Sequence, residues 1–320
     1  MQVYNKLRGL LALSLALPCL LLPSLAVADK PVKVVATFSI LGDMIREIGG
    51  DRVEVMTLVG ANEDVHVYQP RPSDSRTLMQ ADLVVENGLD LKGWMNRLVE
   101  ASGYRGLRVT ASEGISRIRL DEDKHDHKHD HKKDHQHAHA GQDYGEYDPH
   151  AWQGLEQAQV YVHNIRDGLI KADPAGKAYY QARAAAYTAE IQALHSRMSD
   201  RFNALSADRK TVMSPHDAFG YLAKAYGLTL VAPQGISTAS EPSAAEMAAL
   251  VRQIRQQKVA ALFMENIGDT RLVDQLKRET GVVLGGTLYS DALSDDKGPA
   301  ASYLKMMEHN LETLLTALEQ

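Results

Sequence analysis

The chain has almost no cysteine, because Cys19 is the one residue of this type among 320. Cys19 lies in a stretch that we expect to be removed, so the remaining chain would have no disulfide and no thiolate ligand for a metal. An excess of positive charge is also missing, since the formal net charge is −6 at pH 7. A chain with net negative charge is a poor partner for nucleic acid and is mildly suited to binding cations.

The first 28 residues form a segment of their own. Lys6 and Arg8 precede a mostly apolar run over residues 10–22, and small residues follow up to Ala28. This pattern is typical of a secretory signal peptide, so we expect export to the periplasm with cleavage after Ala28. A membrane anchor is the alternative, but the apolar run is short and is broken by proline. A proline also precedes Cys19, where a lipoprotein signal would have a small residue. Loss of the segment changes the net charge from −6 to −8, because it contains two basic residues and no acidic one.

Short β-branched runs alternate with amphipathic stretches in the remaining chain. Residues 31–37 predict a buried strand, and Ser39 is expected to cap the helix that follows it. Further strands are expected at 53–58, 83–85, 108–110, 211–213, 228–231, 260–264 and 282–287, with helices between them that include 217–226, 243–257, 270–280 and 303–318. The alternation predicts an α/β fold of two lobes, each a parallel β-sheet flanked by helices.

One long helix is expected between the two halves. Asp173 and Pro174 are typical of a helix start, and apolar residues follow at steps of three and four from Tyr180 to Leu205. A helix of about thirty residues between two α/β halves indicates a single rigid connector. We therefore expect a signal peptide at 1–28, an N-terminal lobe at 29–172, a connecting helix at 173–207 and a C-terminal lobe at 208–320.

Residues 121–142 are charged, low in complexity and almost free of apolar side chains. Such a segment cannot bury enough surface to offset the entropy of ordering, so we expect a disordered loop when no metal is bound. Seven histidines fall within fifteen residues, a density typical of metal binding or pH response: His125, His127, His129, His131, His135, His137 and His139. A solvated charged loop is the alternative. We interpret the run as an auxiliary, low-affinity collector that raises the local zinc concentration.

Three isolated histidines and one aspartate stand out from the ordinary sequence around them. His66 follows the second expected strand, His150 follows an Asp-Pro turn, and His216 and Asp291 each follow a strand of the second half. Ligands bind at the carboxyl ends of strands in open α/β sheets. Three imidazoles and one carboxylate make a four-coordinate set that suits Zn²⁺. A lone histidine is more often an ordinary polar residue, and Asp291 could cap a turn, so a structural role is the alternative for each.

The neighbours of these residues bear on the chemistry. Asp148 and Asp217 are candidates for holding the imidazoles of His150 and His216 in place. Four protein ligands leave no open position for an activated water, and the sequence has no H-E-x-x-H motif, so a secreted zinc hydrolase is disfavoured. Glu265 would be the best base of such an enzyme, but we interpret it as structural or as a partner of a ligand. Three other histidines lie on expected helices and are interpreted as structural: His163, His195 and His309.

Four motifs occur in order along the chain: Asp64–Asp74 (DVHVYQPRPSD), Tyr147–Trp152 (YDPHAW), Pro215–Tyr221 (PHDAFGY) and Tyr289–Ser294 (YSDALS). Together they resemble the zinc- and manganese-binding solute-binding proteins of ABC importers, the cluster A-I or ZnuA/TroA/AztC-like family. The resemblance implies two α/β lobes joined by one long helix, with the metal between the lobes. It also implies that His66, His150, His216 and Asp291 are the ligands, and that the chain is not an enzyme.

The third ligand position separates the metals in this family. Manganese and iron binders usually have glutamate there and zinc binders have histidine, so His216 implies zinc. A histidine-rich loop before the second ligand is likewise typical of the zinc branch, and Asp291 is similar to the TroA and AztC type. Val65 departs from the family pattern, in which proline often precedes the first ligand. Glu63 and Asp64 are therefore alternative ligands.

The resemblance implies a periplasmic zinc-binding protein that delivers Zn²⁺ to an ABC permease as a monomer, with a periplasmic zinc chaperone as a further candidate partner. Delivery of manganese or iron is one alternative, and a secreted zinc buffer or adhesin without a transport role is another. Because the connecting helix is rigid, we expect metal to order loops and adjust the lobes slightly rather than to cause a wide hinge rotation.

Overall fold

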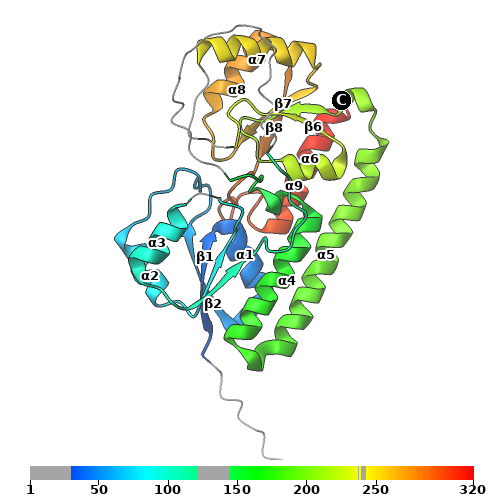
Figure 1. Ribbon diagram of the computed structural model, residues 1–320. Helices are drawn as coiled ribbons and strands as arrows, with labels where there is room; N and C mark the ends of the chain where they lie inside the picture. Colours follow the sequence, from blue (N-terminus) through cyan, green and yellow to red (C-terminus); the bar gives the residue numbers. More distant parts are fainter. Residues whose placement is uncertain (1–29, 92, 121–144, 237, 239–242) are drawn as a thin grey trace, which may run out of the picture. The chain divides into compact units, whose positions relative to one another are not determined.

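Two parallel β-sheets, each of four strands, organise the described part of the chain (Figure 1). The computed structural model describes residues 30–91, 93–120, 145–236, 238 and 243–320. The described residues from 31 to 320 belong to one compact unit. The expected signal peptide at 1–28 and the histidine-rich run at 121–142 lie outside the described residues.

The first sheet has the strand order β2-β1-β3-β4, with all pairs parallel. Its central strand β1 is almost fully buried, as expected for a parallel strand covered on both faces. The strands are β1 (Val32–Phe38), β2 (Val53–Val59), β3 (Leu83–Glu86) and β4 (Leu107–Thr110), and the helices of this half are α1 (Ser39–Gly49), α2 (Pro72–Met79), α3 (Trp94–Ser102) and α4 (Leu155–Ala172). Leu41, Met44, Ile45 and Ile48 give α1 a buried apolar face at helical spacing.

The second sheet repeats this order as β6-β5-β7-β8, again all parallel. The strands are β5 (Thr211–Met213), β6 (Thr229–Val231), β7 (Ala261–Glu265) and β8 (Val283–Leu288), and the helices are α6 (Gly220–Tyr226), α7 (Ala244–Gln256), α8 (Thr270–Thr280) and α9 (Tyr303–Leu318). Leu250 of α7 and Leu276 of α8 belong to a small apolar cluster with Leu262 of β7. Ser243 and Glu246 form the capping box that begins α7. The predicted α/β fold with two parallel sheets is confirmed.

The long helix α5 (Lys177–Ala204) has 28 residues, which corresponds to about 42 Å. It begins after a 3₁₀ turn at Pro174–Gly176, where the Asp173 side chain accepts the Gly176 backbone N–H. One face of α5 is buried from Tyr180 to Phe202, and the helix packs on α4 of the first half and on α6 and α9 of the second. The prediction of one long helix between the halves is confirmed. The residue boundaries given to the lobes remain a prediction.

Two local predictions are wrong. Ser39 is the first residue of α1 rather than its side-chain cap, and its hydroxyl accepts the backbone N–H of Leu293 at 3.0 Å. Helix α6 begins at Gly220 and not at Asp217. The backbone N–H of Asp217 instead donates a hydrogen bond to the carbonyl of Gly235, outside the helix.

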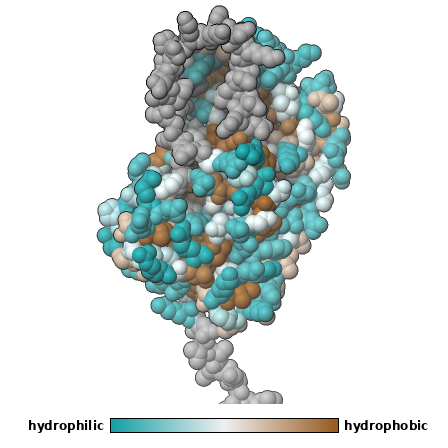
Figure 2. All heavy atoms as spheres, viewed as in Figure 1, coloured by the Kyte–Doolittle hydropathy of each residue, from teal (hydrophilic) through white to brown (hydrophobic). Residues whose placement is uncertain are grey.

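Hydrophilic side chains predominate on the face in Figure 2, with apolar residues scattered between them. Among the described residues, no helix combines the length and the apolar character that a membrane span requires.

Candidate metal centre

Four side chains that lie far apart in the sequence come together, three of them from loops that follow strands. His66 lies in the loop after β2, His150 precedes a 3₁₀ turn at Ala151–Gln153, His216 follows β5, and Asp291 follows β8. Each residue offers one ligand atom, and these atoms all lie within 4.8 Å of one another. All four residues are buried, with His66 the most exposed at 5%. Among the described residues, this is the one cluster of three or more metal-ligating side chains.

The three imidazoles present their Nε2 atoms to one carboxylate. Nε2 of His66 lies 2.9 Å from Oδ2 of Asp291, and Nε2 of His216 lies 3.3 Å from the same oxygen. Nε2 of His150 lies 3.7 Å from Oδ1 of Asp291 and 3.2 Å from Nε2 of His66. Two ligands come from each half of the chain, so any ion bound here would contact both.

Two of the imidazoles have a carboxylate on their far side. Nδ1 of His150 lies 2.9 Å from Oδ1 of Asp148, which also accepts the His150 backbone N–H. Nδ1 of His216 lies 2.5 Å from Oε2 of Glu265, and Oε1 of Glu265 accepts the His216 backbone N–H at 3.1 Å. A carboxylate at Nδ1 fixes the proton there and leaves the Nε2 lone pair for a metal. Asp148 is therefore placed as the sequence predicted, whereas at His216 the carboxylate at Nδ1 is that of Glu265.

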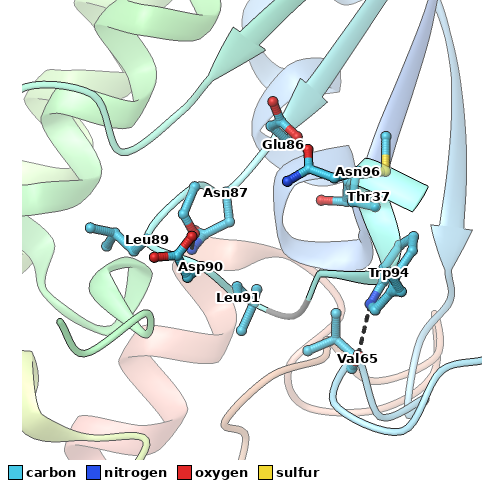
Figure 3. A pocket seen from close by; sticks show the side chains of 11 residues that line it. Thr37, Val65, Glu86, Asn87, Leu89, Asp90, Leu91, Trp94 and Asn96 are labelled. Carbon is cyan, nitrogen blue, oxygen red and sulfur yellow. Dashed lines mark hydrogen bonds between the residues drawn. The ribbon is translucent and has the colours of Figure 1, made fainter. Parts of the chain in front are cut away.

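The loop that carries His66 is held against α3. Oδ1 of Asp64 accepts the His66 backbone N–H at 2.7 Å, and the Trp94 indole N–H donates to the carbonyl of Val65 at 3.2 Å (Figure 3). The pocket beside this contact is lined by Thr37 of β1, by the end of the adjacent strand β3 and the residues after it, among them Asn87, and by Val65 and the start of α3. Val65 is 1% exposed, so packing holds the loop at the position before His66.

Glu63 and Asp64, the alternative ligands, are engaged elsewhere. Oε2 of Glu63 accepts the Gly60 backbone N–H, and Oδ2 of Asp64 accepts the Thr238 hydroxyl proton. Two histidines that were interpreted as structural also have partners outside the cluster. Nδ1 of His195 lies 3.1 Å from the Tyr226 hydroxyl, and Nε2 of His309 donates to the carbonyl of Thr287.

The charges of the cluster favour a cation. Burial alone would raise the pKa of Asp291, but the adjacent imidazoles, that of His216 foremost, hold this pKa well below its usual range. Burial would lower the pKa of His216, and the carboxylates of Glu265 and Asp291 instead raise it well above the usual value. Burial lowers the pKa of His66, which the Asp291 charge offsets only in part. The Asp291 carboxylate is thus stabilised by positive charge on the surrounding imidazoles, and a bound metal ion could supply that positive charge instead.

Several buried atoms at the centre lack hydrogen-bond partners within the described chain. They are Nε2 of His216 and both carboxylate oxygens of Asp291, whose close contacts with the imidazoles do not have hydrogen-bond geometry. Buried polar atoms without a partner cost roughly 1–3 kcal/mol each, so they call for an explanation. A divalent cation bound between the imidazoles and the carboxylate would satisfy them, and the donor set therefore fits such an ion.

Comparison with known proteins agrees with this geometry. The family model described as "Zinc-uptake complex component A periplasmic" matches residues 34–317. The chain belongs to this family. It is therefore a periplasmic metal-binding component of an ABC importer and a solute-binding protein rather than an enzyme. Such proteins work with a membrane permease and an ATPase. The cargo of the family is a divalent metal.

Relatives of similar length have manganese in their names. The manganese ABC transporter substrate-binding lipoprotein PsaA of Streptococcus anginosus is 30% identical over 302 residues, which covers 92% of each chain. The manganese-binding lipoprotein MntA of Halalkalibacterium halodurans is 29% identical and covers 90% of this chain and 89% of its own.

The titles of similar solved structures name zinc in one case and manganese in another. The periplasmic zinc-binding protein TroA from Treponema pallidum matches with a TM-score of 0.79 at 30% identity, covering 90% of this chain and 99% of its own. A manganese-bound periplasmic metal-binding protein from Candidatus Liberibacter asiaticus matches with a TM-score of 0.74 at 27% identity, with the same coverage. The comparisons thus establish the family and a divalent metal, and they leave zinc and manganese as alternatives.

Proposed function

We propose that this chain captures Zn²⁺ with His66, His150, His216 and Asp291 and delivers it to an ABC permease. The observation that supports the proposal is the donor set, in which three imidazole nitrogens surround one carboxylate. Imidazole is a softer ligand than carboxylate and suits zinc, whereas manganese favours carboxylate, carbonyl and water oxygens.

The spacing of the ligand atoms fits zinc, although the donor set and not the spacing separates zinc from manganese. Tetrahedral zinc with bonds of about 2.0 Å separates its ligand atoms by about 3.3 Å. Oδ2 of Asp291 lies 2.9 and 3.3 Å from Nε2 of His66 and His216, Oδ1 lies 3.7 Å from Nε2 of His150, and the four ligand atoms all lie within 4.8 Å of one another. A site with this spacing accepts a tetrahedral ion after small adjustments of side chains.

Delivery of manganese is the second candidate, and the names of relatives such as PsaA and MntA favour it. A given site of nitrogen and oxygen ligands binds manganese more weakly than zinc. A preference for manganese would need a geometry that disfavours four-coordination. The one carboxylate of the cluster offers at most two of the oxygens that such a geometry requires.

Competitive titration of the chain from residue 29, with residues 121–142 deleted, tests the proposal. Zinc and manganese are each titrated against a chromophoric chelator, for the unaltered sequence, for His216→Ala and for His216→Glu. We expect one tight zinc equivalent and much weaker binding of manganese. Loss of a residue that only orients a ligand costs about 10- to 100-fold in metal affinity. We expect His216→Ala, which removes a ligand itself, to lose more zinc affinity than this. We expect His216→Glu to reduce the difference in affinity between zinc and manganese. Preference for manganese in the unaltered protein would overturn the zinc assignment.

Transport needs a test of its own, because a secreted zinc buffer or adhesin would pass the titration. We propose export to the periplasm after cleavage of residues 1–28, which the N-terminal mass of the secreted protein tests. Deletion of the gene should lower zinc uptake when zinc is limiting. Unchanged uptake would favour a buffer or adhesin.

A further inference from the structure

The backbone that leads into Asp291 is held by an amide side chain of the last helix. Oδ1 of Asn310 on α9 accepts the Tyr289 backbone N–H at 2.8 Å, and Nδ2 of Asn310 donates to the Tyr289 carbonyl, also at 2.8 Å. Asn310 is fully buried. Both backbone groups of the residue two positions before Asp291 are therefore fixed to α9.

The same backbone is held from another direction by the segment that follows His150. Nε2 of Gln153 donates to the carbonyls of Tyr289 at 3.1 Å and Ser290 at 2.6 Å. The indole N–H of Trp152 donates to the Ser290 carbonyl at 2.8 Å. Trp152 and Gln153 are both fully buried. Two residues next to one candidate ligand thus bind the backbone next to another, across more than 130 positions in the sequence.

Helix α9 also holds the His150 side of this contact. The Tyr303 hydroxyl donates to the Trp152 carbonyl at 2.7 Å. Tyr303 and Asn310 are seven residues apart, so they lie on one face of α9, about 10 Å apart along its axis. The Asp43 side chain of α1 in turn accepts the Tyr303 backbone N–H at 2.7 Å, at the N-terminus of α9. Helix α9 therefore holds both the segment after His150 and the segment before Asp291.

We infer that Gln153 and Trp152 are positioning residues that set the separation between His150 and Asp291, so that these two ligands form a preassembled pair. The inference rests on the proposed function, because it concerns two of the four proposed ligands. His150 is tied to this contact by a short turn, in which the Gln153 backbone N–H donates to the His150 carbonyl at 3.0 Å. Asp291 directly follows Ser290.

The other two proposed ligands are held by different means. His66 depends on Asp64 and on the Trp94 contact to Val65, and His216 depends on Glu265. The preassembled pair therefore provides a fixed imidazole and a fixed carboxylate, one from each half, to which the other two imidazoles are added. A metal that binds such a pair spends less of its binding free energy on ordering ligands.

A purely structural role is the competing explanation, since buried carbonyls need donors wherever they occur. The chain offers a matched control in Asn164 of α4, whose Nδ2 donates to the carbonyls of Ala111 at 2.8 Å and Glu113 at 2.9 Å. Asn164 and Gln153 thus have the same chemistry, an amide that donates to two backbone carbonyls. Of the two, Gln153 is the one that contacts backbone beside a proposed ligand.

The experiment compares Gln153→Met, Trp152→Phe and Asn164→Leu in the chain from residue 29. Trp152→Phe keeps an aromatic ring and removes the N–H donor, so it is the variant best able to fold. Zn²⁺ affinity is measured by chelator competition, ligand geometry by the visible absorption of bound Co²⁺, and unfolding of the metal-free protein by heating. We expect zinc affinity to fall about 10-fold in Gln153→Met and several-fold in Trp152→Phe, with a changed Co²⁺ spectrum in both. We expect Asn164→Leu to lower the unfolding temperature and to leave affinity and spectrum unchanged.

A double-mutant comparison separates positioning from general loss of stability. In the Asp291→Ala background the fixed pair no longer exists, so Gln153→Met should have little further effect on zinc affinity. In the His216→Ala background the pair remains, and the about 10-fold effect should persist. Equal effects of Gln153→Met in both backgrounds would overturn the inference, and so would unchanged affinity and spectrum in Gln153→Met and Trp152→Phe. In either case one tight zinc equivalent in the unaltered protein would leave the proposed function standing. Absence of that equivalent would overturn both.

Discussion

The carboxylate of Glu265 lies 2.5 Å from Nδ1 of His216 and also accepts the His216 backbone N–H. Both residues are buried; Glu265 ends strand β7, and His216 follows the adjacent parallel strand β5. A carboxylate in this position fixes the rotation of the imidazole and directs Nε2 at Asp291, and it raises the electron density that the ligand offers to a metal.

Replacing Glu265 with glutamine should therefore weaken zinc binding. We expect a loss of about 10-fold, because the amide keeps the shape of the side chain and loses the charge that pairs with Nδ1. Chelator competition measures the effect. Glu146→Gln is the matched control, since Glu146 is a half-exposed acid paired with Arg119, and its substitution should not change zinc affinity. Equal affinity of the Glu265 and Glu146 variants would show that the His216 contact is unimportant for binding.

Asp43 should make the free energy of unfolding of the metal-free protein decrease as pH rises from 4 to 6. Burial raises the pKa of Asp43 from 3.8 to about 6, against the Tyr303 backbone N–H, which lowers it. The folded chain therefore holds this proton to higher pH than the unfolded chain, so the free energy of unfolding decreases as pH rises through this window. Asp43→Asn keeps an acceptor for Tyr303 and removes the titration. The variant should gain about 1–3 kcal/mol relative to the unaltered chain between pH 4 and pH 7. A difference between the two chains that does not change with pH would contradict this assignment.

Asp173 should stabilise the junction before α5 with the opposite pH dependence. Its Oδ2 accepts hydrogen bonds from Arg52 at 2.7 Å and from the Tyr180 hydroxyl at 2.7 Å. Burial alone would raise the pKa of Asp173, but these hydrogen bonds hold it below its usual value. The contribution is present above the usual pKa and is lost as pH falls through the folded-state pKa. Asp173→Asn should lower the free energy of unfolding by about 2 kcal/mol at pH 7. Denaturant unfolding tests this, with the exposed Asp167→Asn as control. Equal midpoints of the two variants would be the contrary result.

Deletion of residues 121–142 should reduce the total zinc bound and leave one tight equivalent, because the proposed primary ligands lie outside this run. Equilibrium dialysis followed by metal analysis gives both quantities. Loss of the tight equivalent together with the weak ones would mean that primary ligands lie within the deleted segment.

His66, His216 and Asp291 could be predicted to lie at the carboxyl ends of parallel strands, because each follows a strand. His150 follows no named strand, and the resemblance of its motif implied that it joins the other three. The contact of Glu265 with His216 could not be assigned, since it depends on β7 lying next to β5. Asp217, adjacent in sequence, was the simpler expectation. Strand order is a tertiary property, and short strands of three to five residues carry little information about their neighbours.

Long-range polar contacts account for the other differences. Ser39 resembles a helix cap, but its hydroxyl accepts an N–H from Leu293, which is 254 positions away. Gln153 and Asn310 look like ordinary polar residues of helical sequence, and their role depends on the backbone of Tyr289. Neither pattern has a local signal in the sequence.

The small conformational change expected on metal binding remains a prediction. Helix α5 packs on helices of both halves, and Asn62 and Asn266 join loops of the two halves at 3.2 Å. These contacts favour local ordering over a wide rotation. Small-angle X-ray scattering of the metal-free and zinc-loaded protein should give nearly equal radii of gyration, and a large difference would contradict the expectation.

The most direct measurement is zinc-edge X-ray absorption of the chain from residue 29 without residues 121–142, loaded with one equivalent of Zn²⁺. The account predicts four-coordinate zinc with three imidazole nitrogens and one carboxylate oxygen at about 2.0–2.1 Å, and one imidazole fewer in His216→Ala. Six-coordinate zinc, or an unchanged number of imidazoles in His216→Ala, would contradict the claim that these four residues bind the metal.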